Sequence, residues 1–466
     1  MASRAPSSLA DLRSRRIVIV GAGPTGLGAA WRLAELDVPH VTVYEREPYP
    51  GGLAASFRDD AGFTWDVGGH VQFSHYGYFD RVMDRVMGDE WLHHERESWI
   101  WIRDRFVPYP LQRNIQCLPD AEKRACVLGL LRRTAGGSTA NFRDWIIARF
   151  GTGLAETFLL PYNAKVWACP PEEMDFGWVG ERVAEVDLER VVLNLLDGRP
   201  DVSWGPNSRF RFPARNGTGE IWRRVAAALP GGVLRYGRQV VAIDAERSRI
   251  QLDGGEAEPF DVLLSTMPLD CLAAAAGGRF APLARGLRHS GVHVVGIGLR
   301  GTAPPAFASK CWIYFPEDVC PYYRLTVFSN YSPHNVPDAA TTWSVMVEVS
   351  ESPSKSVDHG RLRESVVDGL IATRVIESHS QVLSYWHHFA PHGYPTPFLG
   401  RDAVVDPLIE AFEQHAIFSR GRFGAWKYEV SNQDHSFMQG VECVDRLAFG
   451  SEETTLHRPH VVNGRS

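Results

Sequence analysis

The hydrophobic pattern of the chain begins with four apolar β-branched residues at Ile17–Val20. A glycine-rich turn follows at residues 21–26, and apolar positions then recur at helical spacing over residues 27–34. A second apolar run, Val41–Tyr44, ends at Glu45. This order predicts a strand, a tight turn, a helix and a second strand parallel to the first.

Further along the chain the period of the pattern changes twice. Residues 83–194 are mostly helical in spacing, whereas residues 290–350 alternate as strands do, most clearly over 292–299 and 343–349. Near the end, Met438, Val441, Val444 and Leu447 recur at helical spacing, which predicts a helix that begins just after residue 432. The length of 466 residues allows two to three structural units.

Composition narrows the class of protein. Lys and Arg total 49 against 55 Asp and Glu, a net charge of −6, which argues against non-specific nucleic-acid binding. The 44% hydrophobic and 22% charged residues are typical of an ordinary globular protein. No apolar run approaches the roughly 20 residues that span a bilayer, so we expect no membrane insertion.

Cysteine and histidine usage favours a reducing compartment without a metal site. The seven cysteines are odd in number and form no CxxC pair, and no apolar signal segment precedes Ile17, so we predict a cytoplasmic protein. The side chains of His93 and His94, and of His387 and His388, diverge on a helix or a strand. We therefore predict no metal.

The glycine-rich turn has the chemistry of a dinucleotide site. Gly21 permits the turn, Gly23 lets backbone N–H groups approach a pyrophosphate, and Gly26 lets the helix lie close to the strand. Glu45 stands where a carboxylate can accept both ribose hydroxyls, which favours this interpretation over a glycine turn in an unrelated α/β protein. The pattern alone leaves FAD and NAD both open.

The segment after Glu45 favours FAD over NAD, because it resembles a known FAD-binding signature. The pair Gly51-Gly52 resembles the FAD-binding signature of the flavin amine oxidase superfamily. From residue 17 almost to the end, the chain is moreover similar to eukaryotic-type UDP-galactopyranose mutases, through blocks such as Gly69-His70, FVPYPLQRN (106–114), PYNAKVW (161–167), WVGERVA (178–184), WGPN (204–207), KCWIYFPED (310–318) and RGRFGAWKYEVSNQDHSFM (420–438).

The resemblance implies an isomerase that interconverts the pyranose and furanose forms of a nucleotide sugar, UDP-galactose in the first place. In that family, N5 of the reduced flavin attacks the anomeric carbon and displaces UDP. The implied cofactor is FAD, active when reduced, with NADPH or NADH as reductant. The implied partners are a UDP-sugar and, in some members, further copies of the chain as a homo-oligomer.

The implied fold class is α/β, a discontinuous Rossmann-like FAD-binding domain with an inserted helical domain and an antiparallel β-sheet substrate domain. We divide the chain into five stretches accordingly. Residues 1–85, 201–285 and 396–466 are expected to build the FAD domain, the second stretch also carrying a flap. Residues 86–200 are expected to be mostly helical and 286–395 to form the substrate sheet.

Family positions also imply the site residues. Those expected to be catalytic are His70, Arg182, Arg324 and Asn207. Those expected to bind substrate are Tyr109, Gln112, Asn163, Trp167, Tyr314, Tyr394 and Tyr428. Those expected to bind the cofactor are Gly21, Gly23, Gly26, Glu45, Gly51, Gly52, Gly69, His75, Arg422, Asn432, Gln433 and Ser436. Arginine forks and tyrosine hydroxyls suit a diphosphate.

Each assignment has a structural alternative, and two departures keep other activities open. Trp167 and Tyr314 could be core residues, and Asn207 a turn residue after proline. Ser431 stands where the family usually has glycine, and Gln72 replaces an apolar residue near the sugar side. Alternatives are therefore a mutase of another nucleotide sugar, an FAD-dependent oxidase or desaturase, and an inactive flavin-binding module.

Overall fold

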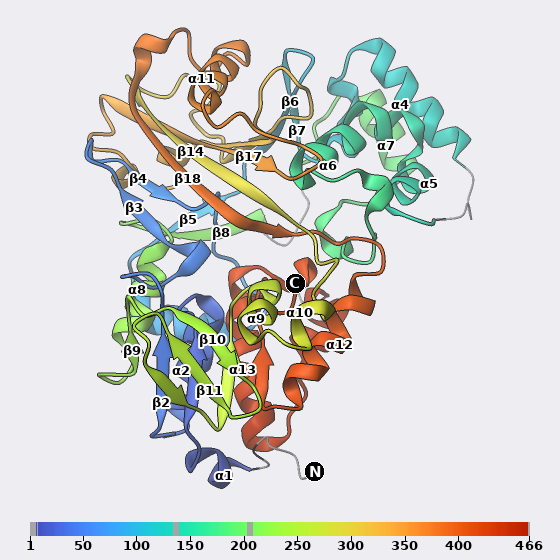
Figure 1. Cartoon of the computed structure of the whole chain (residues 1–466). Helices are drawn as coiled ribbons and strands as arrows, with labels where there is room; N and C mark the ends of the chain where they lie inside the picture. The colour runs from blue at the N-terminus through green and yellow to red at the C-terminus, as the bar shows by residue number, and fades with distance from the viewer. Residues whose placement is uncertain (1–5, 7, 134–138, 203–207, 465–466) are drawn as a thin grey trace.

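The computed structural model describes residues 6, 8–133, 139–202 and 208–464. Its lower half in Figure 1 is built on a five-stranded sheet in the order β19-β13-β1-β2-β9. Every pair in this sheet is parallel. The strands are β1 (Ile17–Val20), β2 (Val41–Tyr44), β9 (Leu234–Arg235), β13 (Val262–Ser265) and β19 (Ile417–Ser419).

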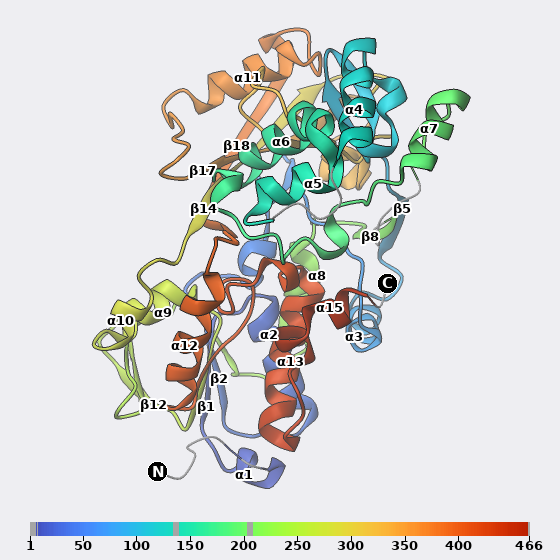
Figure 2. The ribbon, with the colours of Figure 1, turned by 90° about the vertical axis from the view of Figure 1, so that its right-hand side faces the viewer.

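Three distant stretches of the chain therefore build one Rossmann-like sheet, which makes this half discontinuous. All four residues of β1 are buried, as expected for a parallel strand covered on both faces. The helices α2 (Pro24–Glu35) and α13 (Gln433–Phe449) lie against each other beside it (Figure 2). A three-stranded antiparallel sheet of β10 (Val240–Asp244), β11 (Arg249–Leu252) and β12 (Ala257–Pro259) adjoins.

The other helices of this half surround the sheet and the junction with the upper half. They are α1 (Leu9–Arg13), α3 (Gly77–Met87), α8 (Gly219–Ala227), α9 (Leu269–Ala276), α10 (Phe280–Leu283), α12 (Arg401–Glu413), α14 (Thr454–His457) and α15 (Pro459–Asn463).

The upper half is a seven-stranded sheet in the order β18-β14-β17-β16-β15-β6-β7. Its strands are β6 (Ser98–Ile102), β7 (Arg105–Pro108), β14 (His289–Arg300), β15 (Trp312–Tyr314), β16 (Arg324–Thr326), β17 (Thr342–Glu351) and β18 (Val382–Pro395). Neighbours are antiparallel except β15 and β6. The helix α11 (Leu362–Ala372) covers one face, and apolar side chains of β14 and β17 pack against it.

Two small antiparallel sheets of two strands each lie between the halves (Figure 1). β3 (Ser56–Arg58) pairs with β4 (Thr64–Asp66), and β5 (Trp91–Glu95) pairs with β8 (Arg209–Pro213). The expectation of helix from residue 86 onward is wrong for residues 91–108, which form β5, β6 and β7. The alternating aromatic and β-branched residues of Ser98–Ile102 fit a pleated strand, and β15 supplies a partner more than 200 residues away.

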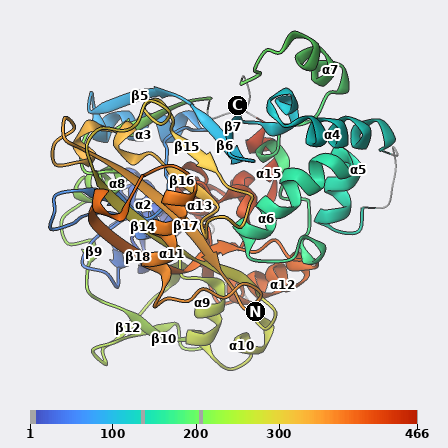
Figure 3. The same ribbon diagram turned by 90° about the horizontal axis from the view of Figure 1, so that it is seen from above.

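Helices α4 (Asp120–Arg132), α5 (Phe142–Leu154), α6 (Leu160–Trp167) and α7 (Leu188–Asp197) form a layer beside one end of the upper sheet (Figure 3). The short 3-10 turn Gly180–Arg182 lies between α6 and α7 in the chain and contacts α15. No helix among the described residues is long and apolar enough to cross a membrane.

Candidate active site

The glycine-rich turn after β1 is closely packed at its ends and open in the middle. Gly21 has a φ of +99°, and a Cβ there would lie 2.2 Å from Oγ1 of Thr266. A Cβ on Gly26 would lie 1.9 Å from the carbonyl oxygen of Gly21. At Gly23, by contrast, the nearest atom to a Cβ is the Gly51 oxygen at 3.9 Å, so the protein itself leaves this position free for a bound group.

Gly23 is also the residue that precedes the first turn of α2, so the free N–H groups of the helix face the same space. Gly51 and Gly52 close it from the other side, since the Gly51 N–H donates to the Ala22 carbonyl at 2.9 Å. The set fits the pyrophosphate of a dinucleotide.

Glu45 is buried at the end of β2 beside this turn. Its Oε2 accepts the Ala22 N–H at 2.7 Å and its Oε1 accepts the Glu47 N–H at 2.8 Å. Burial raises the pKa of this carboxyl, while the two N–H groups oppose the rise. Each oxygen keeps a lone pair for a ribose hydroxyl.

The residues near the C-terminus that were predicted to bind the cofactor lie at the beginning of α13, which packs against α2. Asn432 precedes the first turn, and the Ser436 N–H donates to the Asn432 carbonyl at 2.8 Å. Gln433 accepts the indole N–H of Trp222 at 2.7 Å, so its side chain has a structural partner. His75 is buried, with Nδ1 2.7 Å from Oδ2 of Asp434. Sequence reasoning missed Asp434 as the partner of that imidazole.

The Gly69-His70 loop is fixed to the upper sheet by Glu348 of β17. The Gly69 N–H donates to Oε1 of Glu348 at 3.0 Å. Burial lowers the pKa of His70 to about 4, with Arg324 and Arg422 acting in the same direction. The imidazole of His70 is therefore neutral at pH 7, and its Nδ1 is buried without a partner among the described residues.

Glu348 also holds Arg324, its cross-strand partner on β16. The guanidinium donates through Nε at 2.9 Å and through Nη2 at 2.6 and 2.8 Å, and the Tyr323 hydroxyl donates to Oε2 at 2.5 Å. Burial alone would raise the pKa of Glu348, but these donors hold it below its ordinary value. Arg324 therefore reaches the site already neutralised by a carboxylate that the sequence did not identify.

Arg182 and Arg422 converge on the tyrosines. The Arg182 guanidinium carbon lies 5.2 Å from the ring centre of Tyr428, and that of Arg422 lies 4.9 Å from Tyr394 and 5.8 Å from Tyr428. The Tyr323 and Tyr394 hydroxyls are 3.3 Å apart. Both terminal nitrogens of Arg182 are buried, and within the described chain they have no hydrogen-bond partner.

Ser431, which departs from the family pattern, has a defined place in this cluster. Its Oγ accepts from Nη1 of Arg422 at 2.9 Å and donates to the Tyr428 carbonyl at 2.8 Å. Arg422 further donates to the Gly393 carbonyl at 2.8 Å. The serine hydroxyl thus orients a guanidinium and the backbone of a tyrosine, which a glycine cannot do.

The remaining predicted substrate residues form an aromatic group beside α6. Ring centres are 5.0 Å apart for Tyr109 and Tyr314, and 4.7 Å apart for Trp167 and Tyr428. Gln112 donates through Nε2 to the Ala184 carbonyl at 2.8 Å, which leaves its buried Oε1 without a partner among the described residues.

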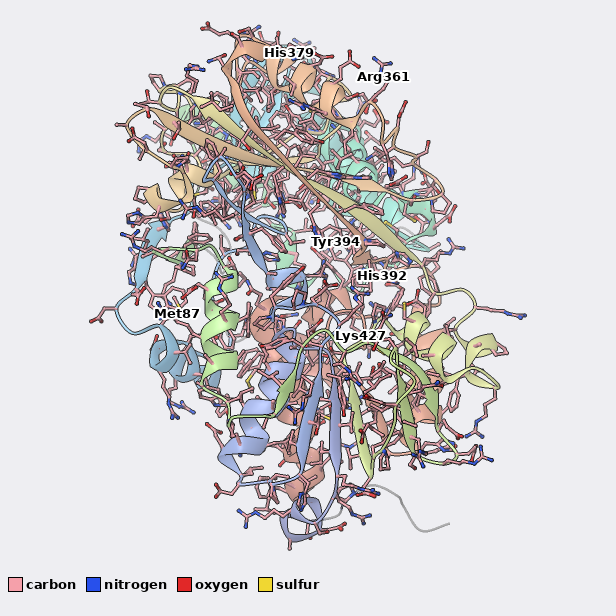
Figure 4. All side chains as sticks on the ribbon, turned by 60° about the vertical axis from the view of Figure 1, so that its left-hand side comes forward. Met87, Arg361, His379, His392, Tyr394 and Lys427 are labelled. Atoms are coloured by element: carbon pink, nitrogen blue, oxygen red, sulfur yellow. The ribbon has the colours of Figure 1, made fainter. Side chains whose placement is uncertain are left out.

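Asn163, on the same helix as Trp167, donates to the Leu159 carbonyl at 2.8 Å. Figure 4 shows Tyr394 and His392 on β18 at the waist of the molecule, where the upper sheet meets the lower half. The predicted residue Asn207 lies outside the described residues.

The fold and the glycine-lined turn together define a dinucleotide-binding protein with a second, seven-stranded sheet above the nucleotide-binding half. Comparison with known proteins agrees. The model of the family "Flavin containing amine oxidoreductase" matches residues 24–305. A zeta-carotene-forming phytoene desaturase of Myxococcus xanthus is 49% identical over 59 residues, 13% of this chain and 11% of that relative. The chain thus matches only a small part of that curated protein.

Among solved structures, reduced UDP-galactopyranose mutase is similar with a TM-score of 0.94 and 48% identity, covering 97% of both chains. A protoporphyrinogen oxidase-like structure from Exiguobacterium, at 17% identity and a TM-score of 0.70 over 94% of this chain and 99% of that one, shares the fold. The chain belongs to the flavin-containing amine oxidoreductase family, and within it to the UDP-galactopyranose mutases.

Proposed function

We propose that this protein is a flavin-dependent mutase that interconverts UDP-galactopyranose and UDP-galactofuranose. Identity of 48% over 97% of the chain supports the family reaction. The observation that carries the proposal is the buried guanidinium of Arg182, which has no partner among the described residues and faces Tyr428. An unpaired buried cation is costly in a folded protein, and an anionic ligand removes that cost.

The cofactor fits the residues present. Gly23 leaves space for the pyrophosphate beside Gly51, Glu45 offers carboxylate lone pairs to the ribose, and Glu348 fixes the Gly69-His70 loop to the upper sheet. Reduced FAD, when bound, supplies a nucleophilic N5 toward a sugar carbon. The cofactor residues and the reductant, NADPH or NADH, are part of this proposal.

In this proposal, side chains of the protein hold the diphosphate when its bond to the sugar is broken. Arg182 supplies charge-assisted donors, and the hydroxyls of Tyr394 and Tyr428 donate without adding charge. Arg422, expected to bind the cofactor, lies against the rings of both tyrosines. Arg324 contributes the N–H groups that Glu348 leaves free. An Arg–phosphate pair at about 4 Å is worth roughly 4 kcal/mol at an effective dielectric of 20 before desolvation.

The aromatic group is proposed to hold the uridine. Tyr109 and Tyr314 offer ring faces to a flat base. Because Nε2 of Gln112 is held by the Ala184 carbonyl, its Oε1 is presented in a fixed orientation to a base N–H. Asn207 and His75 are assigned to the sugar side and to the flavin by family position. We further propose that the protein is cytoplasmic and forms a homo-oligomer.

The test is anaerobic product analysis. The dithionite-reduced protein is incubated with UDP-galactofuranose, and the nucleotide sugars are separated chromatographically. We expect conversion to UDP-galactopyranose over many turnovers with no net oxidation of the flavin. An oxidase would instead leave UDP-galactofuranose unchanged, because its flavin is already reduced and no oxygen is present to reoxidise it. Parallel incubations with other UDP- and GDP-hexoses test whether Gln72, buried and unpaired within the described chain, changes sugar choice.

A further inference from the structure

Three ligand-type side chains meet on the upper sheet, on the face opposite the proposed active site. His293 comes from β14, Glu351 is the last residue of β17, and His359 lies in the segment before α11. Oε2 of Glu351 lies 2.9 Å from Nε2 of each histidine, and the three ligand atoms are all within 4.8 Å of one another.

The alternation of the strands places this cluster away from the active site. On β14, Val295 and Ile297 share the face of His293 and pack with the core under α11. On β17, Glu348 lies on the other face, where it holds Arg324 and Gly69. The cluster is therefore separate from the residues proposed to bind flavin and substrate.

We propose that His293, Glu351 and His359 form a binding site for a divalent transition metal of the zinc class. Two imidazoles and one carboxylate are ligands that zinc prefers, at about 2.0–2.2 Å. A water would complete the tetrahedron, because 55% of the His359 side chain is accessible to solvent.

A second contact orients the buried ligand. Nδ1 of His293 lies 3.0 Å from Nε2 of His387 on β18, and its ring stacks on Phe389 at a centroid distance of 4.4 Å. A metal-binding histidine commonly uses its other ring nitrogen for such a contact, which fixes the ring and its tautomer. His387 is thus a positioning residue.

Lys355, a cation in the same loop, has its own partner, because its ammonium donates to the Ser350 carbonyl at 2.7 Å.

The sequence predicted no metal because adjacent histidines such as His387 and His388 diverge. That reasoning holds for neighbours in the chain, but it does not address ligands from three separate segments. A metal ion bound at this site would hold the loop between Glu351 and His359 against the sheet. The same loop begins at Ser352, whose hydroxyl donates to the Ala168 carbonyl just after α6.

The experiment measures zinc binding by the tag-free FAD-loaded protein, with a chromophoric chelator as competitor and elemental analysis after dialysis. We expect one Zn²⁺ per chain at this site and at least tenfold weaker binding for His359→Ala and Glu351→Gln. Zinc should also raise the Tm of the unmodified protein, but not that of His359→Ala.

The matched control is His379→Ala. His379 pairs with Asp368 at 2.9 Å and is similarly exposed, but within the described part of the chain this pair has no third ligand. Figure 4 shows His379 and Arg361, two residues past His359, at the same end of the molecule, far from Tyr394. Equal zinc affinity in the unmodified protein and His359→Ala, or an equal loss in His379→Ala, overturns the proposal. Because His359 is exposed, its variant remains informative even if Glu351→Gln fails to fold.

Discussion

Replacing Arg182 by alanine separates function from stability more sharply than any other change at the site. The guanidinium already lies buried without a partner among the described residues. The desolvation cost of the guanidinium is therefore already present before substrate binds. Little of the free energy of the phosphate contact is offset by further desolvation. Hydrogen bonds to charged groups contribute about 1.5–3 kcal/mol net, and we expect the upper end of that range.

A loss of about 3 kcal/mol corresponds to a decrease of kcat/KM by roughly 150-fold. The thermal stability of the variant should rise or stay unchanged. Arg182→Ala removes an unpaired buried charge and loses only a cation–π contact with Tyr428, worth about 0.5–2 kcal/mol. We expect the Tm to stay equal or rise.

The assay follows UDP-galactofuranose turnover by the dithionite-reduced enzyme, together with calorimetric melting of the substrate-free protein. Arg143→Ala is the control, since that arginine is exposed on α5 and pairs with Glu172 at 3.2 Å. We expect neither kcat/KM nor Tm to change appreciably in it. Unaltered turnover in Arg182→Ala, or a marked fall in its Tm, would show that the guanidinium is a structural group and refute the reasoning.

Three further outcomes follow from individual contacts. Glu348→Gln removes the charge that neutralises Arg324, so the free energy of unfolding in urea should fall by about 3 kcal/mol. Asp66 is buried and its pKa is raised to about 7, so the unfolded chain binds fewer protons than the native one between pH 3.8 and 7. Stability should therefore fall by roughly 2.5 kcal/mol from pH 5 to 8 relative to Asp66→Asn, and parallel pH profiles would contradict this. Glu45→Gln should weaken FAD binding about tenfold in reconstitution titrations, through loss of carboxylate lone pairs.

The parts of the fold that the sequence predicted are those encoded locally. The βαβ opening, the long strands β14 and β17 and helix α13 all appear where the hydrophobic period indicated them. The error at residues 91–108 has a physical cause. β6 is stabilised by β15, and pairing across such a separation leaves no mark in a local window.

The same distinction between local motifs and long-range contacts applies to the site. The glycines after β1 are a local motif with a steric reason for each position, whereas the group that holds Arg324 depends on strand register. Glu348 faces Arg324 only because β16 and β17 pair with those two residues opposite each other. The resemblance predicted Arg182 as a phosphate ligand and Arg422 as a cofactor-binding residue, but the difference in their hydrogen bonding could not be predicted. Ser431 and Gly393 satisfy Arg422, while Arg182 is left without a partner among the described residues.

The side chain of Glu348 contacts two groups that have different roles in the proposed function. The same carboxylate accepts the N–H of Gly69, in the loop above the cofactor region, and the guanidinium of Arg324, on the substrate side. A movement of either group therefore changes the hydrogen bonds available to the other. Arg182 has no such link among the described residues, so its effect should be confined to substrate. The site thus combines a rigid frame, set by a buried ion pair, with an uncompensated cation whose partner is the ligand.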